Sequence, residues 1–340
     1  MGRPGQRAAL QGGPLISSIY ASAARARRRH YTARPGRQRR LGRPVISVGN
    51  LAVGGRAKTP LVARIASLLA AAGERPAVLS RGYARQDASE TVVVRDAQGL
   101  RADLTRSGDE PLMLARRLPG VVVISGADRY SSGVLAETTY GCTVHVLDDG
   151  FQHLRLHRDV DIVSVAAQDL ANPVTLPGGR LREALDALDA ASAVIALDGA
   201  DPAAIQGHAP VWRARRVLEG ARLIEPAEQP VTPSTGSVVA LAGIAAPDRF
   251  FIDLRELGWP LTRTLAFADH HPYSRDDVDR ILAIARQEGA GMLVTTEKDA
   301  VRLLPLRPFP LPVAYVPLSV AIERNDEFER WLLAALAGAR

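Results

Sequence analysis

Cysteine and long apolar stretches are both scarce in this sequence of 340 residues. The single cysteine, Cys142, has no partner for an internal disulfide and no neighbouring Cys or His at metal-ligand spacing. A reducing compartment is therefore favoured, and neither a disulfide framework nor a zinc site is supported. The longest uninterrupted apolar run, Val238–Ala246, is about half the roughly 20 residues that a membrane-spanning helix needs. We expect no transmembrane span.

Acidic residues are absent from the first part of the chain, where Glu74 is the first, whereas the residues before it include thirteen Arg and one Lys. Nine of those arginines lie within Arg25–Arg43, just after the mildly apolar segment Pro14–Ala24. An apolar face followed by a basic block predicts an amphipathic arm, residues 1–43, that lies on an anionic membrane surface. Two alternatives stay open, namely a solvated Arg-rich tail and an arm that binds nucleic acid.

Lysine is also nearly absent, because 41 of the 43 basic residues are Arg and only Lys58 and Lys298 are Lys. Arg cannot replace Lys where a compact ammonium group must fit among phosphate oxygens. A lysine retained in such a sequence therefore points to a phosphate site. Lys58 lies in a Gly-rich loop that fits this interpretation, whereas the role of Lys298 does not follow from the sequence.

The loop Gly49–Pro60, GNLAVGGRAKTP, resembles the pattern GxxxxGK[ST]. In that pattern glycines let backbone N–H groups converge on phosphates, the lysine reaches the β- and γ-phosphates, and the hydroxyl binds magnesium. Ala52 and Ala57 depart from it, and the Cβ of Ala57 predicts a looser loop or one restricted to negative φ there. The residues expected to bind ATP are Asn50, Val53, Gly54, Gly55, Arg56, Ala57, Lys58, Thr59 and Pro60.

Acidic residues follow another apolar run, Val144–Leu147, which leads straight into Asp148 and Asp149. Carboxylates at the end of a strand beside a phosphate loop hold magnesium, so Thr59, Asp148 and Asp149 form the expected Mg²⁺ site. Paired Asp residues at a strand end also commonly form turns, which is the alternative.

Phosphoryl transfer to a hydroxyl needs a group that receives the proton, and two residues are of the right kind. Asp109 lies in the segment SGDEP just before a helical pattern, where capping the helix is the alternative role. His270 lies in FADHHP, much later in the chain. Adjacent histidines in a loop are otherwise mostly surface residues.

Apolar runs of strand length alternate with helical patterns, beginning with Val45–Val48 and including a helical pattern over Leu181–Leu188. This predicts an α/β fold, a P-loop NTPase-like parallel sheet with helices on both faces, over residues 44–230. A polar, proline-bearing stretch before Val238 indicates a boundary. We expect residues 231–340 to form a second, smaller α/β domain that completes the active-site cleft and ends in a helix over 326–337.

Eight motifs in order resemble those of the tetraacyldisaccharide 4′-kinase (lipid A 4′-kinase) family, from Pro44 to about Leu304. Any one of them could be accidental, but eight in this order are highly specific. They are VGNLAVGGRAKTP (48–60), SRGYAR (80–85), GDEPLMLA (108–115), DDGFQHLRLHRD (148–159), LPGGRLRE (176–183), AGIAAPDRFF (242–251), FADHHPY (267–273) and TTEKDAVRL (295–303). The family loop usually reads GGxGKTP, so Ala57 is a departure here too.

The resemblance implies ATP- and Mg²⁺-dependent phosphorylation of the 4′-hydroxyl of an acylated glucosamine disaccharide 1-phosphate. It implies a peripheral or monotopic protein on the cytoplasmic face of the bacterial inner membrane, with no nucleic acid and no obligate protein partner. Asp109 and His270 correspond to a base dyad, and three further residues to substrate or phosphate contacts: Arg81, Tyr83 and Arg129.

Two other functions share part of this pattern. A regulatory ATPase or GTPase of the GGxGKT type has the phosphate loop but does not explain FADHHPY or TTEKD. A nucleic-acid-binding protein is suggested only by the Arg-rich arm.

Overall fold

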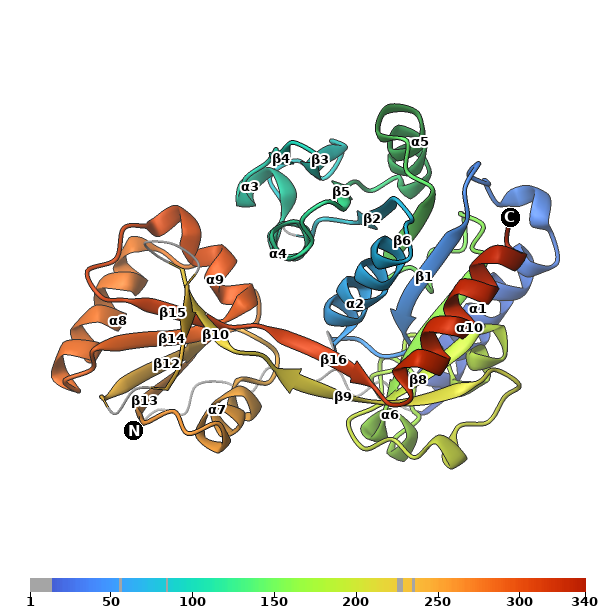
Figure 1. Cartoon of the computed structure of the whole chain (residues 1–340). Coiled ribbons are helices and arrows are strands. Elements are labelled where there is room, and N and C mark those ends of the chain that lie inside the picture. The colour runs from blue at the N-terminus through green and yellow to red at the C-terminus, as the bar shows by residue number, and fades with distance from the viewer. Residues whose placement is uncertain (1–13, 55–56, 84, 225–228, 234–235) are drawn as a thin grey trace.

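Two β-sheets, each covered by helices, make up the computed structural model, which describes residues 14–54, 57–83, 85–224, 229–233 and 236–340. We call the ten-stranded sheet with its helices the large unit and the six-stranded sheet with its helices the small unit. Figure 1 shows the two units side by side, with the long strands β9 and β16 leading from one to the other. The expected α/β class, a large parallel sheet plus a smaller α/β part, is confirmed.

The helices and strands of the large unit come from the first part of the chain and from its C-terminal end. They are α1 (Pro14–Thr32), η1 (Pro35–Arg37), β1 (Val45–Asn50), α2 (Lys58–Ala71), β2 (Pro76–Ser80), β3 (Val92–Asp96), β4 (Gly99–Leu100), α3 (Leu104–Ser107), α4 (Asp109–Arg117), β5 (Val122–Ser125), α5 (Arg129–Tyr140), β6 (Val144–Asp148), β7 (Val160–Ala166), α6 (Ala167–Ala171), η2 (Leu185–Ala190), β8 (Ala193–Leu197), η3 (Pro202–Ala204), β9 (Val211–Leu218), β16 (Leu318–Ile322) and α10 (Asn325–Gly338).

The small unit lies between β9 and β16 in the sequence. Its elements are β10 (Ala221–Leu223), β11 (Pro230–Val231), β12 (Val238–Ala242), α7 (Pro247–Glu256), β13 (Leu261–Ala266), α8 (Arg275–Gln287), β14 (Met292–Thr296), α9 (Glu297–Leu303), η4 (Leu304–Leu306) and β15 (Val313–Val316). Its strand order is β11-β10-β15-β14-β12-β13.

The large sheet has the order β16-β9-β8-β7-β1-β6-β2-β5-β3-β4. All strands from β9 to β5 run parallel, whereas β16 and β3 are antiparallel to them at the two edges and β4 pairs antiparallel with β3. Parallel strands end at the same edge of a sheet, so the loops after β1, β2, β5 and β6 meet there. In an open α/β sheet this carboxyl edge is where ligands bind.

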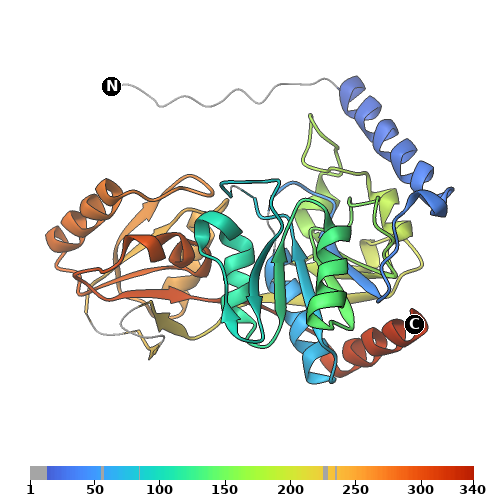
Figure 2. The same cartoon turned by 90° about the horizontal axis from the view of Figure 1, so that it is seen from above.

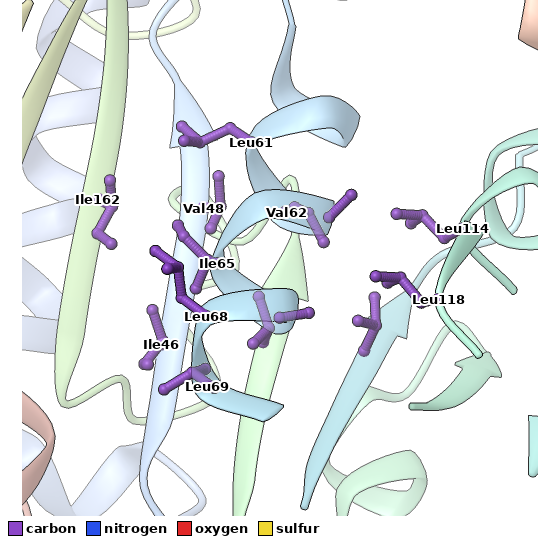
Figure 3. Packing of buried hydrophobic residues seen from close by; sticks show 14 of the residues in the cluster. Ile46, Val48, Leu61, Val62, Ile65, Leu68, Leu69, Leu114, Leu118 and Ile162 are labelled. Carbon is purple, nitrogen blue, oxygen red and sulfur yellow. The ribbon is translucent and has the colours of Figure 1, made fainter. Parts of the chain in front are cut away.

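Helix α2 packs on the centre of the large sheet through a fully buried stripe. Leu61, Ile65 and Leu69 recur at every fourth residue, so their side chains lie on one face of the helix. They meet Ile46 and Val48 of β1 in one apolar cluster (Figure 3). Each such side chain buried in place of water contributes about 1.5–3 kcal/mol. The first turn of α2 is thereby held against the end of β1.

The last strand and helix return to the large unit, which differs from the expected small domain over residues 231–340. Strand β16 pairs antiparallel with β9 of the large sheet. Strands β10 and β11, which lie at or before the expected boundary, belong to the small sheet instead. Helix α10 buries Phe328 against Trp212 of β9, with ring centroids 5.2 Å apart. In Figure 2, α10 lies with the large unit, on the far side of the sheet from α1. The cause is burial, because the apolar face of α10 has its partner on β9.

The helix expected over Leu181–Leu188 is wrong. Leu181 forms bridges with Ala52 and Thr175, and the backbone N–H of Arg182 donates to the carbonyl of Leu51 at 2.6 Å. Only the short 3-10 helix η2 follows. The backbone around Leu181 and Arg182 hydrogen-bonds to the Gly-rich loop, so these groups are not free for helical hydrogen bonds.

Replacing Phe328 by Ala should lower the free energy of unfolding by about 3–5 kcal/mol, because a fully buried aromatic ring is lost and a cavity remains. Urea denaturation of the purified chain measures this change. The control is Ile252→Ala, since Ile252 is 45% exposed and its removal should change stability by no more than about 0.5 kcal/mol. Equal losses for the two variants would show that α10 is not anchored through Phe328.

Candidate active site

The Gly-rich loop begins where β1 ends at Asn50 and leads into α2. Gly49 has no room for a side chain, because an added Cβ would lie 2.5 Å from the Cβ of Phe151. Gly54 has φ +95°, which favours glycine. Two of the expected ATP-binding residues, Gly55 and Arg56, lie outside the described residues. The remaining loop residues lead into the first turn of α2, and the first turn of a helix is where backbone N–H groups without helical partners can bind an anion.

Ala57 has φ +53° and ψ 20°, the left-handed conformation, at the position just before α2. The expectation that an alanine would restrict this position to negative φ is therefore wrong. Its side chain is buried in the apolar cluster under the loop. A non-glycine residue in this region costs about 1–2 kcal/mol.

Lys58, the first residue of α2, points to the end of β6. Its Nζ lies 2.7 Å from Oδ1 of Asp149. Arg182 binds both oxygens of the same carboxylate, with Nη1 to Oδ2 at 2.9 Å and Nη2 to Oδ1 at 2.7 Å. Burial alone would raise the pKa of Asp149, but Arg182 and Lys58 hold that pKa well below its usual range. Asp149 is thus a charged anchor for both cations.

Asp148 has the opposite character, although it is the next residue in the chain. Burial, together with the neighbouring charge of Glu110, raises the pKa of Asp148 well above its usual range despite the proximity of Lys58. Ser80 Oγ donates to its Oδ2 at 3.2 Å, and no ion pair compensates the carboxylate among the described contacts. A buried carboxylate without an ion-pair contact suits a divalent cation.

The residues present fit magnesium bound together with a phosphate. Mg²⁺ is usually held by one or two carboxylates plus substrate phosphates and waters. Asp148 and the hydroxyl of Thr59 supply protein oxygens of this kind, whereas both oxygens of Asp149 are already ion-paired. Within the described ranges no group of three or more His, Cys, Asp or Glu forms a metal cage without a substrate.

Asp109 and His270 come from different units and meet. Asp109 is the first residue of α4, and its Oδ2 lies 2.9 Å from Nδ1 of His270. His270 has φ +58°, in the loop that follows β13. Asp109 does not cap α4, whose N-cap is Gly108 without a side-chain bond. The two expected proton-handling residues thus form one hydrogen-bonded pair between the units.

The three expected substrate contacts lie close to the same edge but differ in exposure. Tyr83 is 65% exposed, and its ring centroid lies 5.3 Å from that of His270. Arg81 is exposed as well. Arg129 is buried at the start of α5 and donates to the carbonyl of Gly126 at 2.9 Å. Burial lowers the pKa of Arg129 to about 10.

Helix α1 is docked on the large unit by a buried ion pair. Arg28 donates to both carboxylate oxygens of Glu183, at 2.7 and 2.8 Å, and its guanidinium lies 4.1 Å from the ring centre of Phe151. Ser17 accepts from the backbone N–H of Gly178 at 3.0 Å. The described part of the arm is therefore an anchored helix, which excludes a solvated tail there. No described helix has the length and apolarity to cross a membrane.

The outer side of α1 carries apolar side chains that none of the described residues covers. They are Leu15, Ile16, Ile19 and Tyr20, with exposed fractions of 73%, 52%, 61% and 38%. A row of large exposed apolar residues on one helix marks an interaction surface.

Sequence reasoning missed two arginines of the site, Arg182 and Arg302. Arg302 of α9 binds Asp109 Oδ2 through Nη2 at 2.5 Å and Nε at 2.9 Å. Both lie in motifs that the sequence analysis quoted. In a chain with 41 arginines, however, their residue type gives no signal. Only their positions within the two motifs, relative to the other motif residues, could have identified them as site residues.

Comparison with known proteins gives one consistent family. The family model described as tetraacyldisaccharide-1-P 4′-kinase matches residues 14–337. The tetraacyldisaccharide 4′-kinase of Geobacter metallireducens is 46% identical over 86% of this chain and 88% of its own. That of Geobacter sulfurreducens is 40% identical over 94% and 95%. A crystal structure of the "apo" form of LpxK from Aquifex aeolicus in complex with ATP has TM-score 0.79 and 30% identity, covering 95% of this chain and 98% of that one.

Replacing Ala57 by Gly should raise the free energy of unfolding by about 1 kcal/mol, because glycine adopts the left-handed conformation without the Cβ penalty. Urea denaturation is the measurement. Ala70→Gly is the matched control, since Ala70 is exposed within α2 and glycine there should cost about 1 kcal/mol. If both substitutions destabilise, Ala57 does not hold a left-handed conformation in solution.

Proposed function

The chain belongs to the tetraacyldisaccharide-1-P 4′-kinase family, and we propose from its site how its residues transfer phosphate from ATP to the 4′-hydroxyl of the lipid A precursor. The observation that carries the proposal is the contact of Asp109 with His270, 2.9 Å apart, beside Glu110, whose charge acts on Asp148 at the end of β6. The two groups come from different units, Asp109 from the large unit and His270 from the small unit. The enzyme is an ATP-dependent kinase of lipid A biosynthesis.

The Gly-rich loop and the first turn of α2 bind the phosphates of ATP in this proposal. Backbone N–H groups at the start of α2 face the anion, and the helix dipole favours its charge. The Lys58 ammonium, which rests 2.7 Å from Asp149, reaches the β- and γ-phosphates. Arg182 stays on Asp149 and keeps that carboxylate in place.

Thr59 and Asp148 would hold Mg²⁺ together with phosphate oxygens. When bound, the ion neutralises charge that develops on the β- and γ-phosphates during transfer. The sequence predicted that both Asp148 and Asp149 bind the ion. We assign only Asp148, because Asp149 already has two cationic partners. With the ion bound, Asp148 gains the ion-pair contact that it lacks among the described residues.

Asp109 receives the proton of the acceptor hydroxyl, and His270 holds the carboxylate in position. The transition state of phosphoryl transfer is loose, so little charge builds up on the attacking oxygen. A carboxylate with a low pKa can therefore orient the hydroxyl and accept its proton late. Arg81 and Tyr83, which are exposed beside this pair, are positioned to contact the sugar or its phosphate, and Arg129 supports the same edge.

We further propose that α1 holds the enzyme on the cytoplasmic face of the inner membrane, as a monotopic protein. ATP is available on that face, and its anionic lipids attract basic segments. The apolar side of α1 would enter the interfacial layer, while Arg28 and Ser17 keep the other side on the large unit. The lipid substrate would then reach the site from the membrane. No obligate protein partner is needed in this scheme.

The two other functions have less support. A regulatory ATPase or GTPase is excluded by the family. Nucleic-acid binding by the arm is disfavoured because several of its arginines pair with carboxylates of the same chain, as Arg25 with Asp186 and Arg39 with Asp128.

Lys58→Ala and Asp109→Ala should each lower kcat by at least about 100-fold, because one removes a phosphate ligand and the other the proton acceptor. Purified protein, labelled ATP, Mg²⁺ and the tetraacyldisaccharide 1-phosphate in detergent provide the assay. Asp279→Ala, which removes an exposed carboxylate of α8, should leave the rate unchanged. Near-normal turnover by either site variant would refute this mechanism.

Replacing Leu15 and Ile19 together by Gln should weaken binding to phosphatidylglycerol vesicles roughly 10- to 100-fold, since two apolar side chains no longer enter the membrane. Cosedimentation measures the bound fraction. Added salt should weaken the binding of the unchanged protein, because its arginines contribute. Leu257→Gln, at a residue 48% exposed on the small unit, is the control. Equal binding by the double variant and the control would exclude α1 as the membrane contact.

A further inference from the structure

Four charged or polar side chains from both units surround the proton acceptor Asp109, and two of them, Lys298 and Arg302, have no role so far. Asp109 and Glu110 begin α4 of the large unit, whereas His270, Lys298 and Arg302 belong to the small unit. Helices α4 and α9 lie side by side in the structure. Lys298 is one of only two lysines in the chain. Its position here gives a physical reason for its presence.

Arg302 determines which oxygen of Asp109 is available. Its Nε and Nη2 both donate to Oδ2, which also receives Nδ1 of His270. Its Nη1 donates to the carbonyl of Gly243 and to Asp299 Oδ1, at 2.8 and 2.9 Å, so the guanidinium is held at both ends. The side chains of Arg302 and Asp109 are only 5% and 7% exposed. Oδ2 is saturated, which leaves Oδ1 to face a substrate.

Among the residues that the structure describes, Oδ1 of Asp109 has one partner, the backbone N–H of Glu110 at 2.8 Å. A carboxylate oxygen can accept two hydrogen bonds. The second position on Oδ1 is thus the one where an acceptor hydroxyl can donate.

Lys298 fixes the protonation pattern of His270. Its Nζ donates to Glu110 Oε1 at 2.8 Å and lies 3.1 Å from His270 Nε2. An ammonium group has hydrogen-bond donors only, so the nitrogen that faces it must accept. The ring proton then lies on Nδ1 and is donated to Asp109. The other tautomer would direct an N–H at the ammonium and a lone pair at the carboxylate, and both contacts would be repulsive.

Of the other groups near the ring, two are compatible with this pattern and one, Arg302, competes with it. Oδ1 of Asp269 is 4.0 Å from Nε2, beyond hydrogen-bond distance, and the ring of Tyr83 packs against the imidazole. Arg302 Nη2 lies 3.3 Å from Nδ1 and would favour a lone pair there, but its contact with Asp109 Oδ2 is shorter, at 2.5 Å, so the arginine and Nδ1–H both donate to that oxygen. An arginine could not replace Lys298 here, because its planar fork is larger than the space between Nε2 and the Glu110 carboxylate.

We propose that Lys298 and Arg302 are positioning residues for the transfer, which hold His270 as the Nδ1–H tautomer and turn Oδ1 of Asp109 toward the acceptor hydroxyl. The inference rests on the proposed function of Asp109. In the step, the hydroxyl oxygen bonds to the γ-phosphorus, the bond from that phosphorus to the β–γ bridging oxygen breaks, and the hydroxyl proton passes to Oδ1. ADP leaves, and Asp109 returns the proton to water.

The electrostatics support the return of the proton. Burial alone would raise the pKa of Asp109, but the hydrogen bond from His270 and the charges of Lys298 and Arg302 hold it well below the usual range. The carboxylate is therefore ionised at the start of each turnover. Removing a cation raises this pKa, so activity on the acid side should be lost at higher pH than in the unchanged enzyme.

Lys298→Met tests the proposal in the kinase assay across pH. We expect kcat to fall about 10- to 100-fold with KM for ATP changed less than about twofold, and the acid limb of the kcat profile to move to higher pH. Lys298→Arg should not restore the rate, although it restores the charge. Arg249→Met, which removes an exposed arginine paired with Asp253 in α7, should match the unchanged enzyme. A Lys298→Met enzyme with unchanged kcat and unchanged acid limb would overturn the proposal.

A second measurement does not depend on turnover. The ¹⁵N shifts of the histidine rings report the tautomer, and His270→Gln identifies the signal of His270. We expect a protonated Nδ1 and an unprotonated Nε2 in the unchanged protein, and loss of this pattern in Lys298→Met, or in Lys298→Gln if the first variant does not fold. A proton on Nε2 in the unchanged protein would overturn the inference. An inactive unchanged enzyme with the expected tautomer would instead count against the proposed function alone.

Discussion

The parallel pairing of β1 with β6 is the constraint on which the rest of the site depends. In its register Val48 lies opposite Asp148, so the Gly-rich loop and the two aspartates leave the sheet side by side. A shift by one residue would turn the buried side chains of β1 to the wrong face. The apolar contacts between α2 and β1, shown in Figure 3, hold the first turn of α2 against this strand. Because Lys58 is in that turn, the same contacts set its position.

Neighbouring carboxylates of the site have opposite pKa shifts because their surroundings differ. Asp149 has Lys58 and Arg182 and stays charged, whereas Asp148 is buried beside other acids and gains from a cation. Asp109 is again surrounded by cations, but these come from the small unit. One half of the chemistry is thus built within the large sheet, and the other half exists only where the two units meet. This division explains why the proton acceptor depends on residues almost two hundred positions away, such as Arg302, at a sequence separation of 193.

Much of this arrangement could be predicted from the sequence, and the exceptions have physical causes. The motifs around Lys58, Asp148 and Asp109 carry residue types that few other roles demand, and strand patterns placed them at one edge of a sheet. The left-handed Ala57 could not be foreseen, because tertiary packing overrides a local preference. Leu181 has a helical pattern but bonds to the loop instead. The arginines at 182 and 302 were hidden by the abundance of that residue, and the return of α10 to the large unit depends on long-range contacts that periodicity does not encode.

The path of the chain also sets an order for biosynthesis. Strands β9 and β16 belong to one sheet, but the whole small unit lies between them in the sequence. During translation the small unit has all its strands before the ribosome has made β16 and α10. Domains generally fold as units while the chain emerges. The large unit is synthesised first, but its sheet edge at β9 and the apolar face under α10 stay uncovered until the last residues are made. A chain truncated before β16 would therefore contain a complete small unit attached to an incomplete large unit.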